Sequence, residues 1–165
     1  LALPMILIYV IADAGSVTGG WLSSFFIKKG WTVNRSRKLT MLLCSCVILP
    51  VVFATRTSNE WVAVILIGMA AGGHQAWSAN AYTLTSDLFP RKATASVIGI
   101  GGSISATLSI LATFALGHVL DHQGRQGYFY AFLVAGFIYL FALAAIQLIS
   151  PRLTPVNQRE GHAIL

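Results

Sequence analysis

Long apolar runs alternate with short polar links along this chain. The apolar runs are continuous, they are much longer than the roughly 10 residues of a membrane-spanning β-strand, and they show no alternation of period two. A helix needs roughly 20 apolar residues to cross the hydrocarbon core of a bilayer. The pattern therefore predicts five transmembrane helices and a polar tail, over residues 3–27, 39–55, 61–84, 93–120, 128–149 and 151–165 respectively.

The composition supports an all-α membrane protein. Of the 165 residues, 56% are hydrophobic and 10% are charged, whereas a soluble domain carries about 25% charged residues. So few charges cannot cover the surface of a water-soluble domain, and the lipid bilayer is the expected solvent. A net charge of +6 would favour nucleic acid as the partner of a soluble protein. Here the charges flank apolar runs, so no nucleic acid is expected.

The basic residues alternate from link to link, and this alternation predicts the topology. Lys and Arg are retained on the cytoplasmic side of the membrane during insertion. We place the link after the first span in the cytoplasm because it is the most basic. The basic residues on that side are then Lys28, Lys29, Arg35, Arg37, Lys38, Arg91, Lys92, Arg152 and Arg159. Only Arg56 and Arg125 fall outside. We expect an inner-membrane protein with its amino end outside and its carboxyl end, including the tail, in the cytoplasm.

The third span carries the most polar side chains. One face at helical spacing consists of His74, Trp77, Ser78, Ala81 and Tyr82. Gln75 lies beside this face and Asn80 lies off it. Lipid cannot satisfy such groups, so the face should meet water or polar partners. An interhelical hydrogen-bond seam is one interpretation, and the wall of a substrate cavity is the other. We favour the cavity because several donors cluster there with an aromatic ring.

The first span carries Asp13 near its middle. A carboxylate at that depth costs about 2.5–3.5 kcal/mol, so it should face a cavity or a partner. Both a proton-linked acid and a carboxylate capped by the hydroxyls of a neighbouring helix fit this position. Gly15 and Gly19 form a small-xxx-small step that allows another helix to approach closely.

The other spans carry fewer candidate residues. Pro50 should bend the second span. The glycine- and serine-rich fourth span predicts close helix packing rather than a dinucleotide loop, because no strand precedes it. The fifth span is apolar and aromatic, and we expect most of it to face lipid.

Neither a metal site nor an enzyme is indicated by the reactive side chains. Cys44 and Cys46 lie about 200° apart around a helix, so they cannot share a metal, and both are expected to be buried thiols. Asp13 and Asp87 are candidates for a two-acid mechanism, but Asp87 lies at the membrane edge whereas such a mechanism needs adjacent carboxylates. We predict no catalytic residues.

The link after the first span resembles the repeated cytoplasmic loop of the major facilitator superfamily. That loop has a glycine, a leucine and an acid, and then a glycine and paired basic residues. The matching positions are Gly20, Leu22, Ser24, Lys28, Lys29, Gly30, Arg35, Arg37 and Lys38. Ser24 stands where the acid is usual, and Asp87 in the next cytoplasmic link is the acid that could replace it. The resemblance implies a gating loop that latches helices during alternating access.

Residues 9–24, 72–93 and 96–102 resemble the anion:cation symporter family, and specifically its bacterial hexuronate and other sugar-acid transporters. The resemblance extends to about Ser150. It implies that the five spans are the last five of twelve and that the amino-terminal half is a missing partner. It also implies uptake of a sugar-acid anion driven by a proton gradient, with no bound cofactor.

Residue by residue, the resemblance assigns His74 and Trp77 to the substrate site. Gln75, Ser78 and Asn80 are weaker candidates on the same helix, and Ser103 and Thr107 on the next span could add hydroxyl contacts. An alternative of a different class is a stand-alone five-span protein that serves in assembly. Its glycine-rich helix faces would then be the binding surfaces.

Overall fold

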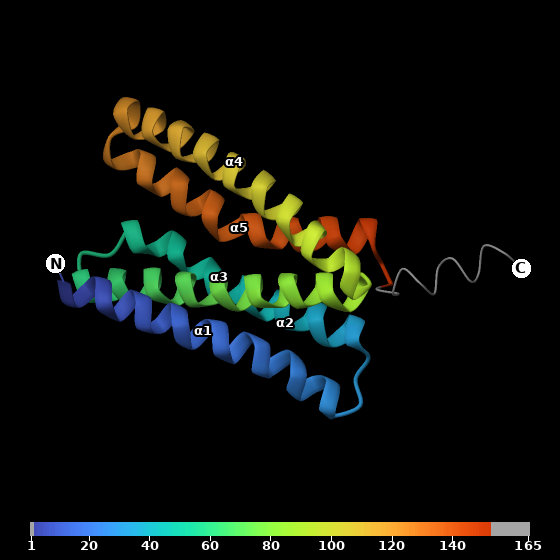
Figure 1. Ribbon diagram of the computed structural model, residues 1–165. Coiled ribbons are helices and arrows are strands. Elements are labelled where there is room, and N and C mark those ends of the chain that lie inside the picture. Colours follow the sequence, from blue (N-terminus) through green and yellow to red (C-terminus); the bar gives the residue numbers. More distant parts are fainter. Residues whose placement is uncertain (1, 153–165) are drawn as a thin grey trace, which may run out of the picture.

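The computed structural model describes residues 2–152, and this part of the chain is a bundle of long helices (Figure 1). Along the chain the helices are α1 (Ala2–Lys28), α2 (Val33–Ile48), α3 (Glu60–Leu88), α4 (Arg91–Gln123) and α5 (Arg125–Ile149), and α2 continues into the 3-10 helix η1 (Leu49–Thr55). With α2 and η1 counted as one, five helices are long and apolar enough to cross a membrane. The predicted all-α fold with five spans is confirmed for the described residues. The predicted tail lies outside them from residue 153 onward.

Local sequence signals set the ends of these helices. The Thr32 hydroxyl accepts a hydrogen bond from the backbone N–H of Arg35 at 3.3 Å, so α2 begins six residues before the predicted second span. Arg35, Arg37 and Lys38 therefore lie on a helix and not in a loop. Gly30 has a φ of +87°, which reverses the chain between α1 and α2.

The predicted bend at Pro50 takes the form of a change of helix type. The chain is α-helical up to Ile48 and 3-10 helical from Leu49 to Thr55. Proline has no backbone N–H to donate, and its ring clashes with the preceding turn of an α-helix. The tighter 3-10 turn lets the span continue as far as Thr55, so that α2 and η1 together reach membrane-spanning length.

Helix α3 lies at the centre of the arrangement. It packs along α1 on one side and also contacts α2, η1 and α4, while α5 packs against α2, η1 and α4 (Figure 1). The α1–α2 link, the α3–α4 link and the end of α5 lie at one end of the bundle (Figure 1). The basic residues of the predicted cytoplasmic side are therefore at one end, apart from Arg159, which lies outside the described residues.

Helices α1 and α3 approach each other through small residues, as the Gly15 and Gly19 spacing predicts. A Cβ atom on Gly19 would lie 2.5 Å from both Cα and Cβ of Ala76, and one on Gly15 would overlap the backbone of Gly72. In lipid there is little hydrophobic drive between helices, so such van der Waals contact is a main source of association. The small residues therefore hold α1 against α3.

Two expectations about packing are wrong. Helix α4 has no buried residue, and a Cβ atom added to Gly99, Gly101 or Gly102 would meet nothing within 4 Å. The described residues therefore do not provide the close packing expected of this helix. Cys44 is buried but Cys46 is exposed. The two thiols point about 200° apart around α2, so only Cys44 is directed toward the neighbouring helices.

Adding one methyl group to Gly19 should destabilise the bundle. We expect Gly19→Ala to lower the free energy of unfolding by about 1–3 kcal/mol, because the new Cβ overlaps Ala76 of α3. Denaturant- or SDS-induced unfolding of the purified chain in detergent measures this. Gly20→Ala is the matched control, since a Cβ there meets nothing within 4 Å. Equal stability of the two variants would contradict the close approach of α1 and α3.

Candidate functional site

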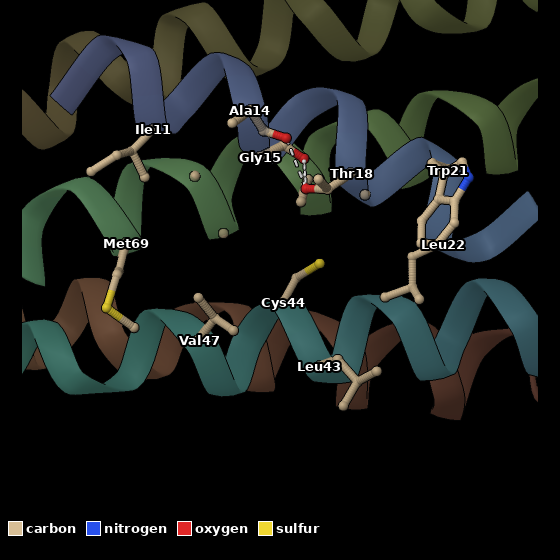
Figure 2. Close-up of a pocket in the computed structure, with 14 residues that line it drawn as sticks. Ile11, Ala14, Gly15, Thr18, Trp21, Leu22, Leu43, Cys44, Val47 and Met69 are labelled. Carbon is tan, nitrogen blue, oxygen red and sulfur yellow. Dashed lines mark hydrogen bonds between the residues drawn. The ribbon is translucent and has the colours of Figure 1, made fainter. Parts of the chain in front are cut away.

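One cavity lies between α1, α2 and α3 and is almost entirely apolar. Its volume is about 410 Å³. Figure 2 shows Ile11, Leu22, Val47 and Met69 around it. The hydroxyl of Thr18 donates to the carbonyls of Ala14 at 2.8 Å and Gly15 at 3.1 Å, within its own helix. This cavity therefore offers few hydrogen bonds to a hydrophilic solute.

A second cavity, which we call the α3–α5 cavity, is lined by polar groups from three helices. It has a volume of about 410 Å³. Helix α3 contributes all five residues of the face predicted from the sequence, and also Thr85. Helix α4 contributes the apolar residues Val97 and Ile98 as well as Gly101, Gly102 and Ser105, and α5 contributes Tyr139. The glycines of α4 thus leave space at this cavity.

An aromatic cluster of His74, Trp77 and Tyr139 forms one side of the α3–α5 cavity. The Tyr139 hydroxyl and His74 Nδ1 are hydrogen-bonded at 2.6 Å. The Tyr139 ring also meets the rings of His74 and Trp77 edge-on, with centroids 5.7 Å and 5.6 Å apart. Tyr139 therefore holds both α3 side chains in place from α5.

The α3–α5 cavity combines apolar surface with neutral hydrogen-bonding groups. Its lining holds an imidazole, an indole, two phenols and the hydroxyls of Ser78, Thr85 and Ser105, and it includes no Asp, Glu, Lys or Arg. The indole Nε1 of Trp77 is buried and has no hydrogen-bond partner among the described residues. Such a wall can bond to the hydroxyl groups of a solute, but it does not neutralise a charge.

The structure places several predicted site residues away from this cavity. The side-chain amide of Asn80 is buried at the α1–α3 contact, where Nδ2 donates to the carbonyls of Gly19 at 3.0 Å and Ala76 at 2.9 Å. It belongs to an interhelical seam because it lies on the face of α3 that packs against α1. Gln75 is exposed and is not part of the cavity lining.

The two α4 hydroxyls that were predicted to contact the solute do not line the α3–α5 cavity either. Ser103 and Thr107 are exposed and donate to the carbonyls of Gly99 and Ser103, both at 3.0 Å. Ser105 is the serine of α4 that lines the cavity, because it shares a helix face with Gly101 and Gly102. Asp13 is exposed on α1 and lines neither cavity.

Tyr139 is the functional candidate that the sequence reasoning missed. The fifth span was expected to face lipid for most of its length, yet Tyr139 is half-buried against α3. A usable signal was present, since the hydroxyl of a tyrosine in the middle of a span needs a hydrogen-bond partner that lipid cannot provide.

Arg37, Asp87 and Ser23 form a polar cluster that joins three helices at one end of the bundle. Arg37 Nε lies 3.1 Å from Asp87 Oδ2, and the guanidinium also donates to Ser23 Oγ at 2.6 Å. Arg37 is only 7% exposed and Ser23 is fully buried. Asp87 thus pairs with a basic residue of the predicted gating loop, as its stand-in for the acid at Ser24 would require. The hydroxyl of Ser24 instead donates to the carbonyl of Gly20 in its own helix at 2.9 Å.

The remaining residues of the predicted gating loop are spread around this cluster. Lys28 is exposed, and Lys29 Nζ lies 4.6 Å from the centre of the Phe25 ring. Lys38 reaches the end of α5, where Nζ donates to Gln147 Oε1 at 2.7 Å and to the Ser150 carbonyl at 2.6 Å. Lys29 and Lys38 therefore have separate partners.

These features define a class: a multi-pass α-helical membrane protein with a cavity between its helices that is lined in part by neutral polar side chains. The chain belongs to the PUCC protein family, which residues 9–159 match. It is 29% identical over 139 residues to the hexuronate transporter of Escherichia coli K12, covering 83% of this chain and 29% of that protein. It is 24% identical to a probable galactarate/D-glucarate transporter of the same strain, covering 81% and 31% respectively.

A third relative is an uncharacterized transporter of Bacillus subtilis, 26% identical over 79% of this chain and 30% of its own length. These relatives confirm the resemblance to bacterial sugar-acid transporters, and each is named as a transporter rather than an enzyme. The chain spans about 30% of the length of the curated relatives that it matches. No solved structure matches it.

The two neighbouring serines at the end of α1 should differ in their effect on stability. We expect Ser23→Ala to lower the free energy of unfolding by about 1–2 kcal/mol, because it leaves a buried N–H of Arg37 without its acceptor. Ser24→Ala should change it by less than about 0.5 kcal/mol, since that hydroxyl is exposed and bonds within its own helix. Unfolding in detergent checks both variants. Comparable losses would contradict the assignment of Ser23 to the Arg37 cluster.

Proposed function

We propose that this chain is the carboxyl-terminal part of a secondary active transporter of the major facilitator type, which takes up a hexuronate or a related sugar-acid anion together with protons. In this proposal the five spans are the last five of twelve. The names of its relatives and the short share of their length that it covers support this proposal. We further propose that the α3–α5 cavity is one wall of the solute site.

The observation that carries this proposal is the composition of that wall. A sugar acid has several hydroxyl groups and one or two carboxylates, so it needs many neutral hydrogen-bonding partners and a cationic anchor. His74, Trp77 and Ser78 supply neutral partners, and Tyr139 fixes the first two. The lining has no basic residue. The rest of the transporter then supplies the anchor and the carboxylates that bind protons, across an interface between two halves.

The Arg37 cluster supports alternating access as the mechanism. Ser23, Arg37 and Asp87 join the ends of α1, α2 and α3, so these three helices can move as one rigid body. Rocking of such a body against the other half would expose the solute site to each side in turn. In this proposal the basic end faces the cytoplasm, because nearly all the basic residues lie there.

Loss of the Trp77 indole should weaken solute binding. We expect Trp77→Ala in the complete transporter to raise KM for the sugar acid by at least tenfold, because it removes both an aromatic contact and the ring that packs on Tyr139. Uptake of radiolabelled glucuronate, galacturonate and glucarate by cells measures this. Gln75→Ala is the control on the same helix, exposed and outside the cavity. Normal kinetics of a correctly inserted Trp77→Ala variant would remove Trp77 from the site.

Loss of a single hydroxyl on α5 should also impair uptake. We expect Tyr139→Phe to reduce kcat/KM by about three- to tenfold, since it removes the hydrogen bond to His74 Nδ1 but keeps the ring that packs on Trp77. Tyr130→Phe, an exposed position on the same helix, is the control. The same uptake assay at matched expression gives the ratio. If the two variants behave alike, Tyr139 does not position His74 for solute binding.

A further inference from the structure

A groove runs between α2 and α5 at the basic end of the bundle, outside both cavities described above. Its volume is about 680 Å³. Trp31, Arg35 and Lys38 lie at the end nearest the α1–α2 link, and apolar side chains that include Leu42, Leu140 and Leu143 line the part farther along the helices. The groove therefore changes from basic to apolar along its length.

Within the part of the chain that the structure describes, no carboxylate pairs with the basic residues of this groove. Lys38 is half-buried, and its Nζ donates to Gln147 Oε1 and to the backbone carbonyls of Ser150 and Pro151, at 2.7, 2.6 and 3.1 Å. All three acceptors are neutral. Among the side chains that the structure describes, Arg37 and Asp87 form the one ion pair, so neither Arg35 nor Lys38 has a carboxylate partner there.

A helix end adds to this positive field. Arg35 lies in the first turn of α2, which begins at Val33, and the amino end of a helix carries a partial positive charge. Backbone N–H groups at such an end also favour phosphate groups. An anion placed beside Arg35 would therefore meet two side-chain cations and a helix dipole at once.

The apolar part of the groove resembles the surface that lipid tails contact. Leu42 lies within a membrane-length span and its side chain is 40% exposed, so it is available to lipid. Trp31 is 44% exposed at the mouth, and tryptophan is enriched at the level of lipid headgroups. The position of Trp31 thus places Arg35 and Lys38 at headgroup depth and the leucines at the depth of the acyl chains.

We propose that this groove binds an anionic phospholipid, such as phosphatidylglycerol, in the leaflet at the level of the α1–α2 link. The phosphate lies beside Arg35 and Lys38, and one acyl chain lies along Leu42 and Leu140. Basic pockets between transmembrane helices bind anionic lipid headgroups in this way. A free phosphate would use only the basic end, and a zwitterionic lipid carries its own cation. Both should therefore bind more weakly than the anionic lipid.

The test is lipid binding to the purified chain in detergent, measured by native mass spectrometry. Dioleoylphosphatidylglycerol and dioleoylphosphatidylcholine are titrated separately, and inorganic phosphate is then added as a competitor. We expect the anionic lipid to bind at least fivefold more tightly than the zwitterionic lipid. Phosphate in tenfold excess should not displace it. Equal binding of the two lipids, or displacement by phosphate, would overturn the proposal.

Two pairs of variants locate the lipid. Arg35→Gln should weaken phosphatidylglycerol binding by about fivefold, the effect of one basic residue near the membrane surface. Arg91→Gln is the matched control, because it removes the same charge at the same end of the bundle but outside the groove. Equal losses for the two variants would mean a general electrostatic effect and would overturn the proposal.

The second pair tests the apolar part and leaves every charge in place. Ala144→Trp should fill the groove and reduce phosphatidylglycerol binding by fivefold or more, because Ala144 is part of its lining. Leu148→Trp, at an 82% exposed position on the same helix that does not line the groove, should not. Unchanged binding by a folded Ala144→Trp variant would show that the acyl chain does not lie here. Since this test measures lipid and not transport, its outcome is independent of the proposed solute.

Discussion

The close contact of α1 with α3 is the constraint on which the rest of the structure depends. Gly15 and Gly19 lie against Gly72 and Ala76 with no room for a further Cβ atom. In a bilayer this contact gains dispersion energy, while larger residues would gain no hydrophobic advantage by being buried from lipid. Because this contact fixes which face of α3 meets α1, it also fixes the direction of every other residue on α3.

The two sides of α3 have different uses as a consequence. Gly72, Ala76 and Asn80 recur every fourth residue on the side that packs against α1. His74, Ser78 and Ala81 lie on the roughly opposite side and line the α3–α5 cavity. One helix can therefore provide both the packing core of the bundle and its polar wall. Asn80 is polar but lies on the side that packs against α1, and its side chain donates a hydrogen bond to the backbone of α1 instead of lining the cavity.

Neighbouring basic residues on α2 also have different partners. Arg37 is buried and is matched by a carboxylate and a hydroxyl, whereas Lys38, one residue later, is matched by neutral oxygens at the end of α5. The first arrangement is complete within the described chain and joins three helices. The second leaves a positive charge beside an apolar groove, which is why the groove and not the Arg37 cluster suits an anionic lipid.

The sequence by itself determined the five helices, the basic end of the bundle and the polar face of α3. These follow from local properties: run length, the position of Lys and Arg, and a repeat of 3.6 residues. It also identified the glycine step of α1, because small residues at that spacing have few other uses in a span. The site residues that came from this periodicity, His74, Trp77 and Ser78, do share one cavity.

Only the tertiary structure decided which partners those residues have. Tyr139 lies far from His74 in sequence, so its hydrogen bond depends on how α5 packs and not on any local pattern. The choice of Ser23 over Ser24 for Arg37, and of Ser105 over Ser103 for the cavity, depends in the same way on how α1 and α4 are rotated about their own axes. A turn of about 100° per residue moves a neighbouring side chain to another face of the helix. Periodicity along one helix cannot specify which face meets which neighbour, because that is set by contacts between helices.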